Sequence, residues 1–250
     1  MGTSILRTQH TSLQFSDSLA QQKHDVRSLF ANGVLYPIKT GTESGNDNAL
    51  NDLVKAEAAE FNHIVHFFRG NWVAIDRKII KPGSVKKGSV FVAKASDVVG
   101  PGHDSGFATV AFDHVDPRIG RVNQAAAHYP TKGSRPGDPN YKITKKYAEE
   151  ISKWMAKVGA GSDLAFVNGD FNMDDAKLDW AHGGNFTSMG DELKKHPNTG
   201  HGPIDGFASY DKDGRVKANG YRVLNDTQRK MFSDHFVCIG AWEITHLKGK

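Results

Sequence analysis

The sequence contains a single cysteine, Cys238, among its 250 residues. One cysteine cannot form an internal disulfide, and a zinc site built from several cysteines is excluded. Cys238 lies in the apolar run Phe236–Ile239, which resembles a strand. This context predicts a small buried hydrophobic residue and not a nucleophile.

Long apolar runs are also missing. None approaches the roughly 20 residues that a membrane-spanning helix needs, and the amino terminus has no charged segment followed by an apolar one. No repeat, heptad pattern or low-complexity tract is present. These absences predict a soluble, intracellular protein of the cytoplasm without a membrane partner.

The composition that remains is that of a globular protein. Apolar residues make up 38% and charged residues 24%, well mixed along the chain. This apolar fraction is enough to build a core at this length. We expect a single catalytic domain over residues 1–250. The net charge of +4, with a pI near 9.0, favours a polyanionic partner, although many enzymes share that balance.

Apolar periodicity predicts helices and strands spread along the chain. The helices are expected at Asp17–Ala31, Ala49–Phe61 and Tyr141–Val158, the last with the clearest apolar face. Strands are expected at Val34–Lys39, Trp72–Ile80, Val90–Ala95, Phe107–Phe112, Val122–Ala127, Leu164–Val167, Arg222–Leu224 and Phe236–Ile244. Strands outnumber helices, which favours two packed sheets with helices outside.

The stretch Leu164–Asp175 carries the clearest chemical signal. A short apolar strand, Leu164–Val167, is followed by a Gly-led turn that sets Asp170 and Asn172 two positions apart. A carboxylate and a carboxamide at the end of a strand can meet a metal ion or a phosphate. The alternative is a plain hairpin turn followed by a helix cap.

Seven polar residues lie where an apolar strand meets a turn, and such junctions can converge at one edge of packed sheets. They are Glu43, His128, Asp170, Asn172, Asp205, Asp234 and His235. Carboxylates brought together repel one another unless a cation lies among them. Oxygen ligands favour Mg²⁺ or Mn²⁺, with Ca²⁺ as a further option.

Two histidines beside such a metal suit phosphoester hydrolysis. One takes a proton from the attacking water, and the other stabilises or protonates the leaving oxygen. The base needs a carboxylate to fix its tautomer, and Asp205 can supply it. Each residue also has a plainer role: Glu43 on the surface, His128 in the core, and Asp205 and Asp234 in turns.

The order of these motifs resembles the endonuclease/exonuclease/phosphatase superfamily, which has the DNase I-like fold. The resemblance rests on Thr42-Glu43, His128 before Tyr129-Pro130, Gly169-Asp-Phe-Asn172, Ile204-Asp205 and Ser233-Asp-His235, which span most of the chain. It implies an α/β (α+β) fold, a four-layer α/β/β/α sandwich, and metal-dependent hydrolysis of a phosphodiester or phosphomonoester.

The resemblance also implies roles for single residues. Glu43, Asp170 and Asp234 would bind the metal, and Asn172 would hold the phosphate. His235, oriented by Asp205, would be the general base, and His128 would stabilise the phosphate or the leaving group.

Some positions depart from the family pattern. Gln9 or His10 stands where the family has an asparagine near the metal at the end of its first strand. Thr42 precedes Glu43 where glutamine is usual, and Pro203 precedes Ile204 where a polar residue is common.

Basic residues flanking the expected site are candidate contacts to the phosphate backbone. They are Lys86, Lys87, Arg121, Lys132 and Arg135. His63 and His66 are three residues apart, on or just after the second helix, but without a third ligand we expect them on the surface.

Three functions fit these residues. The first is a metal-dependent nuclease, a monomer that cuts DNA with little sequence specificity. The second is a phosphatase of a phosphoinositide, a nucleotide or another small phosphoester. The third is a protein that binds nucleic acid on the same scaffold without catalysis.

Overall fold

The computed structural model describes residues 2–14, 19–31, 35–44, 48–99, 105–173, 187–188, 204–224, 235 and 237–248. At positions 14, 19, 43, 44, 187 and 188 only the backbone is described.

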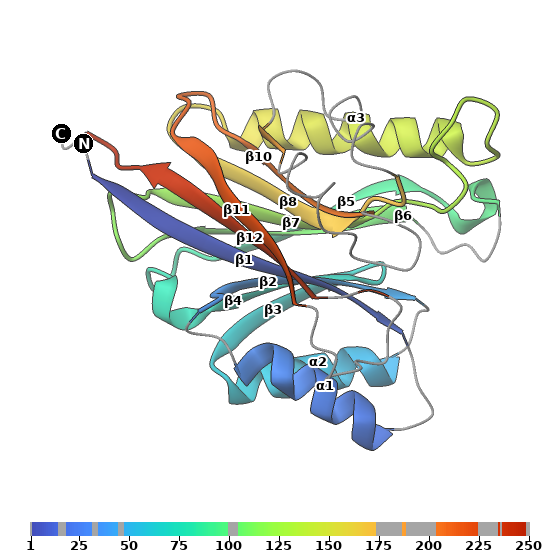
Figure 1. Ribbon diagram of the computed structural model, residues 1–250, viewed down its shortest axis with the longest axis horizontal. Coiled ribbons are helices and arrows are strands. Elements are labelled where there is room, and N and C mark those ends of the chain that lie inside the picture. The colour runs from blue at the N-terminus through green and yellow to red at the C-terminus, as the bar shows by residue number, and fades with distance from the viewer. Residues whose placement is uncertain are drawn as a thin grey trace.

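The first sheet has the strand order β11-β12-β1-β2-β4-β3. Its strands are β1 (Thr3–Gln14), β2 (Ile38–Ser44), β3 (His63–Phe68), β4 (Asn71–Asp76), β11 (Val216–Leu224) and β12 (Val237–Thr245). β1 pairs parallel to β2 and antiparallel to β12. Two helices, α1 (Leu19–Ala31) and α2 (Asn48–Glu60), cover its outer face (Figure 1).

The second sheet has the strand order β5-β6-β7-β8-β10-β9. Its strands are β5 (Lys86–Ala93), β6 (Ser105–Asp113), β7 (Arg121–His128), β8 (Leu164–Asp170), β9 (Thr187–Ser188) and β10 (Asp205–Tyr210). Short 3₁₀ helices span Arg77–Ile79 and Ala95–Asp97. Helix α3 (Tyr141–Val158) connects the parallel strands β7 and β8 and covers the outer face of this sheet (Figure 1).

The result is a four-layer α/β/β/α sandwich, which confirms the predicted architecture (Figure 1). One apolar cluster joins the facing sides of the two sheets and the buried face of α3. In that cluster the rings of Phe166 on β8 and Trp242 on β12 pack against each other at a tilt, with 5.6 Å between their centroids. A second cluster fills the space between the first sheet and the helices α1 and α2.

Two of the predicted helices are confirmed. α3 has the predicted bounds, and its Tyr147, Ile151 and Met155 are fully buried because they recur every four residues on one face. α2 differs from its predicted bounds by one residue at each end. The helix expected at Asp17–Ala31 is α1, whose described part begins at Leu19.

Several strands were placed wrongly from the sequence. β2 covers Ile38–Ser44, so Thr40 to Glu43 lie in a strand and not in a loop. The reason is that the inward positions of β2 are polar and are satisfied by hydrogen bonds, such as Ser12 Oγ to Thr42 Oγ1 at 2.7 Å. β1 is likewise mostly polar, with an apolar run only at Ile5 and Leu6.

Two further predictions are corrected. Asn168 and Gly169 do not form a turn, because β8 continues to Asp170 and is buried along its whole length. His63 and His66 lie on β3, which begins three residues after the end of α2, and not on the helix itself. His63 is only 3% exposed, so its predicted surface position was wrong.

Candidate active site

The carboxyl ends of β7 and β8 bring the first pair of site residues together. These strands are parallel, and their register places His128 opposite Asp170. β10 runs antiparallel to β8 and begins at Asp205, which is also opposite Asp170. One edge of the second sheet therefore carries His128, Asp170 and Asp205 on adjacent strands.

His235 reaches this edge from the segment before β12. Its Nδ1 lies 2.9 Å from both carboxylate oxygens of Asp205. Its Nε2 lies 3.6 Å from Asp170 Oδ2, and His128 Nε2 lies 3.5 Å from that same oxygen. Two imidazoles thus face one carboxylate, and one of them is held by a second carboxylate.

Burial sets the electrostatics of the site. Asp170 is 3% exposed and Asp205 is fully buried. Burial raises the pKa of Asp170 to about 6, and the neighbouring His128 opposes that rise. The His128 side chain is 31% exposed, whereas that of His235 is 9% exposed, so His128 is the histidine that meets solvent.

Asn172 follows the end of β8 in a left-handed backbone conformation, with φ of 47°. Asparagine tolerates this region better than most residues because its side chain bonds locally. The Asn172 N–H donates to Asp170 Oδ1 at 2.9 Å, and its Nδ2 donates to the Tyr129 carbonyl at 2.7 Å. These bonds tie the ends of β7 and β8 together beside the two histidines.

A third histidine enters the site from β1. His10 is fully buried, and its Nε2 lies 3.9 Å from Asp205 Oδ1. Burial lowers the pKa of His10 to about 3, with smaller contributions from His235 and His128. Of the two residues expected near the end of the first strand, His10 is therefore the one that faces the site.

Two buried residues near His10 escaped the sequence reasoning. Thr40 comes after the end of the strand expected at Val34–Lys39, and Asn168 was placed in a turn. Both are fully buried, and the Thr40 hydroxyl is hydrogen-bonded to His10 Nδ1 at 3.0 Å and to Asn168 Nδ2 at 3.2 Å. Extending β8 to Asp170 would have revealed Asn168, because residues two apart in a strand share a face.

The donor set fits a divalent cation. One ligand atom each from Asp170, Asp205 and His235 lies within 4.8 Å of the others. Buried carboxylates in such proximity are stabilised by a cation. Of the other predicted metal ligands, Glu43 is described only by its backbone, which pairs with Leu13, and Asp234 lies outside the described residues.

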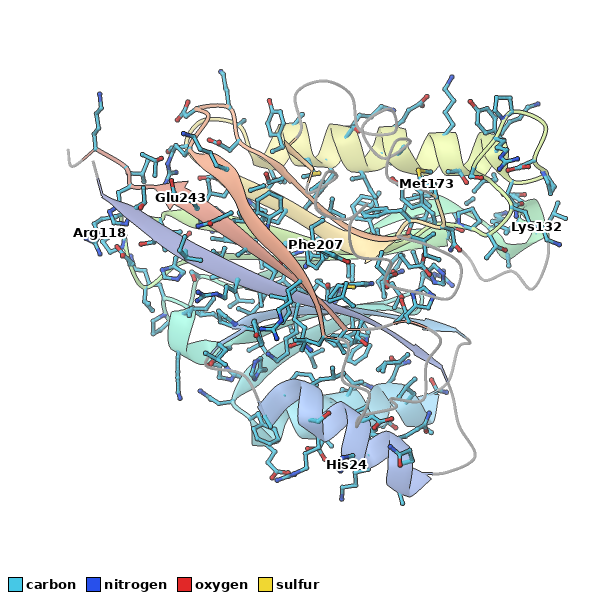
Figure 2. All side chains as sticks on the ribbon, viewed as in Figure 1. His24, Arg118, Lys132, Met173, Phe207 and Glu243 are labelled. Atoms are coloured by element: carbon cyan, nitrogen blue, oxygen red, sulfur yellow. The ribbon has the colours of Figure 1, made fainter. Side chains whose placement is uncertain are left out.

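The predicted phosphate contacts fall into two groups. Lys132 and Arg135 lie in the loop between His128 and α3, at the same edge as the site. Arg121 begins β7 and is about 23 Å along the strand from His128. Figure 2 shows the same separation, since Arg118, in the turn before β7, lies at the opposite end of the molecule from Lys132.

The second group surrounds a cavity of about 350 Å³ below the carboxyl end of α3. Its lining includes Lys86, Lys87, Arg121, Trp154, Lys157 and Asp163. Arg121 is already paired with Asp113 at 2.8 Å, and Lys87 Nζ donates to the Val65 carbonyl. The structure therefore does not bring Lys86, Lys87 and Arg121 together with the two histidines.

Comparisons with known proteins bear on the fold. No family model and no curated protein matches the sequence. Among solved structures, an endonuclease/exonuclease/phosphatase from Bacteroides vulgatus has a TM-score of 0.73 at 13% identity, covering 96% of this chain and 99% of that one. D. rerio TDP2 complexed with a single-strand DNA product has a TM-score of 0.64 at 12% identity, covering 96% and 99%.

A third solved structure is ANGEL2, a 2′,3′-cyclic phosphatase in complex with adenosine-2′,3′-vanadate. It has a TM-score of 0.70 at 9% identity and covers 98% of this chain and 99% of that one. The fold of the chain is therefore the DNase I-like fold of the endonuclease/exonuclease/phosphatase proteins, as the sequence motifs predicted.

Proposed function

We propose that this chain, which has the endonuclease/exonuclease/phosphatase fold, is a divalent-metal-dependent hydrolase that cuts DNA phosphodiesters with little sequence specificity. The observation that carries the proposal is the hydrogen bond from His235 Nδ1 to Asp205, with His235 Nε2 turned toward Asp170. A histidine held in this way has its second nitrogen available for proton transfer.

His235 is the general base in this proposal. Asp205 accepts a hydrogen bond from His235 Nδ1–H, so the proton stays on Nδ1 and the lone pair is on Nε2. That nitrogen takes a proton from the attacking water, and Asp205 then stabilises the imidazolium. The low exposure of His235 keeps its ring in one orientation.

His128 acts at the solvent side of the same carboxylate. Its Nε2 is 3.5 Å from Asp170 Oδ2, and its greater exposure allows it to contact a bound phosphate. From there it donates a hydrogen bond to a phosphate oxygen or a proton to the leaving oxygen. Asn172, whose amide is oriented by the Tyr129 carbonyl, is proposed to contact the phosphate beside it.

Asp170 is proposed to hold the cation, with Glu43 and Asp234 as further ligands. The cation, Mg²⁺ or Mn²⁺, would neutralise phosphoryl charge and lower the pKa of water. Asp170 is suited to this role because it is buried and because its backbone is fixed by pairing with both β7 and β10.

DNA is proposed as the substrate for two reasons. The chain carries a net charge of +4, and Lys132 and Arg135 extend from the loop next to His128. TDP2, which has the same fold, was solved with a DNA product. We further propose that residues 1–250 act as one catalytic domain and as a monomer.

A phosphatase of a small phosphoester is the second candidate. It is favoured by the fold that the chain shares with a 2′,3′-cyclic phosphatase. The same histidines and carboxylates would serve either reaction, because both transfer a phosphoryl group to water. Release of inorganic phosphate without cleavage of DNA would identify this activity.

Plasmid nicking tests the proposal. The full chain is incubated with supercoiled plasmid and Mg²⁺ or Mn²⁺, and phosphate release from a panel of small phosphoesters is followed in parallel. We expect nicking that EDTA abolishes and that His235→Ala reduces by about 10²- to 10⁴-fold. His24→Ala is the matched control, since His24 is exposed on α1, in the helix layer outside the first sheet (Figure 2).

Nicking by His235→Ala at the rate of the His24→Ala control would overturn the assigned base. DNA binding without turnover in any divalent cation would indicate a non-catalytic nucleic-acid-binding protein. Circular dichroism of each variant shows whether the fold is retained.

A further inference from the structure

The cavity below the carboxyl end of α3 lies on the outer face of the second sheet, away from the two histidines. Strands β5, β6 and β7 form its floor, and the end of α3 forms one wall. Its volume of about 350 Å³ falls within the range of small-molecule sites, roughly 300–1,000 Å³. The cavity is therefore large enough for a ligand of its own.

Small side chains line the floor of this cavity. Phe107 of β6 packs against Trp154 of α3, so every second side chain of β6 faces the helix. Thr109 and Ala111 are the next two in that series, and Gly88 of β5 lies opposite Thr109. Ala111 is partly exposed although β6 is an inner strand of the sheet. The helix therefore leaves this part of the sheet uncovered.

An indole ring forms the wall. Trp154 meets the fully buried Phe107 in a T-shaped contact, with 5.8 Å between ring centroids and 72° between the ring planes. This contact holds the indole in place, while the side chain stays partly exposed and lines the cavity. A fixed aromatic ring of this kind provides a stacking surface for a planar ligand.

Two lysines reach the cavity from different elements. Lys86 begins β5 opposite Ala111, so its side chain lies on the face of the sheet that α3 covers. Lys157 lies in the last turn of α3. Within the part of the chain that the structure describes, neither lysine has an ion pair or a side-chain hydrogen bond. An anion between them would be attracted by both.

The other two cations of the lining are already engaged. Successive side chains of a strand point to opposite faces, and Lys87 Nζ donates to the Val65 carbonyl on β3 of the first sheet. Arg121 is paired with Asp113 at 2.8 Å. Recognition of an anion in the cavity therefore falls to Lys86 and Lys157.

The far side of the cavity is acidic. Asp163 directly precedes β8, which is three strands from the strand of Lys86, or about 14 Å across the sheet. A carboxylate accepts hydrogen bonds and repels a second anion. The cavity therefore suits a ligand with one anionic end and one uncharged end that carries N–H donors.

We propose that this cavity binds a nucleoside monophosphate. The phosphate lies between Lys86 and Lys157. The base lies against Trp154, with its N–H groups toward Asp163. A nucleoside monophosphate joins one phosphate to an uncharged planar base, and every base has a face that can stack on an aromatic ring.

This inference goes beyond the proposed function and does not depend on it, because it uses neither the two histidines nor a cation. A DNA duplex, whose major groove alone is about 12 Å wide, does not enter a cavity of about 350 Å³. The site is therefore separate from the duplex contacts proposed for the loop before α3.

Isothermal titration calorimetry of the full chain with AMP provides the test, with adenosine and inorganic phosphate as partial ligands. EDTA is present, so that no divalent cation links AMP to the carboxylates of the active site. Lys86→Ala/Lys157→Ala removes the phosphate contacts, and Trp154→Leu removes the stacking surface. The matched control, Lys87→Ala/Lys145→Ala, removes the same charge from the opposite face of β5 and from an exposed position of α3 outside the cavity.

We expect AMP to bind the wild type about tenfold or more tightly than adenosine or inorganic phosphate does. AMP affinity should fall about tenfold or more in Lys86→Ala/Lys157→Ala and in Trp154→Leu, and the control should bind AMP as the wild type does. Ala111→Leu, which fills the floor and leaves the wall intact, should cause a similar loss and serves in case Trp154→Leu does not fold. Circular dichroism checks the fold of each variant.

Several outcomes would overturn the inference. Equal affinities for AMP and inorganic phosphate would rule out the stacked base. Unchanged AMP affinity in the folded cavity variants would place the nucleotide elsewhere, and an equal loss in the control would mean that overall charge sets the affinity. A wild-type chain that binds no AMP would also overturn it.

These outcomes are separate from those of the plasmid assay. AMP binding that depends on Trp154, in a protein that cuts neither DNA nor small phosphoesters, would support this site and reject the proposed hydrolase. Metal-dependent nicking by a chain that binds no AMP in EDTA would do the reverse.

Discussion

His63 is a buried histidine far from the proposed chemistry. It lies on β3 against Phe30, with 5.2 Å between ring centroids, and its Nδ1 donates to the Phe61 carbonyl at 2.7 Å. Burial, with a smaller contribution from Lys39, lowers the pKa of His63 to about 4. The folded chain therefore resists protonation of His63 at pH values where the unfolded chain accepts the proton.

This difference predicts a loss of stability in mild acid. The stability that neutral His63 contributes is fully present above pH 6.5, the ordinary pKa of histidine. It is lost as the pH falls toward about 4, the pKa of His63 in the folded chain. Between pH 7 and pH 5 His63 should account for about 2 kcal/mol of the decrease in the free energy of unfolding. We expect the free energy of unfolding of His63→Gln, measured in urea at both pH values, to decrease by about 2 kcal/mol less than that of the wild type. His24→Gln should show the same decrease as the wild type.

Asp205 offers a second test at the scale of the residue. Asp205→Asn keeps the size of the side chain but removes the charge that stabilises the protonated His235. We expect kcat for plasmid nicking to fall by about 10²- to 10⁴-fold, with a smaller effect on KM. Asp113→Asn is the control, because Asp113 pairs with Arg121 at the far end of β7.

At the scale of the element, the parallel pair β7 and β8 builds most of the site. The crossover through α3 brings both carboxyl ends to one edge, where His128 and Asp170 lie opposite each other. The apolar run Leu164–Val167 was enough to predict β8. It did not show that the strand continues for three more residues. Asn168 to Asp170 are polar or glycine, and they remain in the strand because pairing with β7 and β10 continues through them.

The loop between β7 and α3 carries the basic residues next to the site. If Lys132 and Arg135 contact the phosphate backbone, the double variant Lys132→Ala/Arg135→Ala should bind DNA more weakly. The slope of log affinity against log salt should decrease by about 0.9 for each contact removed. Lys86→Ala/Lys87→Ala changes the net charge equally at the remote cavity and should leave the slope unchanged.

Fluorescence anisotropy with a DNA duplex over a range of salt concentrations measures both slopes. Equal losses in the two double variants would mean that overall charge, and not the loop, sets the affinity.

At the scale of the whole molecule, the two sheets share one core. The main apolar cluster includes Leu6 and Trp242 from the first sheet and Phe107 and Phe166 from the second. Neither sheet can separate without exposing this surface, so we expect one cooperative unfolding transition. Far-UV circular dichroism and tryptophan fluorescence in urea should give the same midpoint, and different midpoints would contradict a single domain.

The sequence by itself determined the layered architecture and the helix that covers the second sheet. α3 was predictable because its apolar face repeats with the helical period over 18 residues. The polar residues at the strand ends were identifiable as site candidates because each interrupts or follows an apolar run. The order of these motifs also indicated the fold.

The tertiary structure alone decided which of those candidates meet. The pairing register of the strands placed His128, Asp170 and Asp205 side by side. Arg121 lies away from them, because Arg121 and His128 are at opposite ends of β7. It also buried His10, Thr40 and Asn168 together, although they are far apart in the chain and are polar. Apolar periodicity reports burial against a core, whereas polar groups are buried only when another strand supplies their hydrogen bonds.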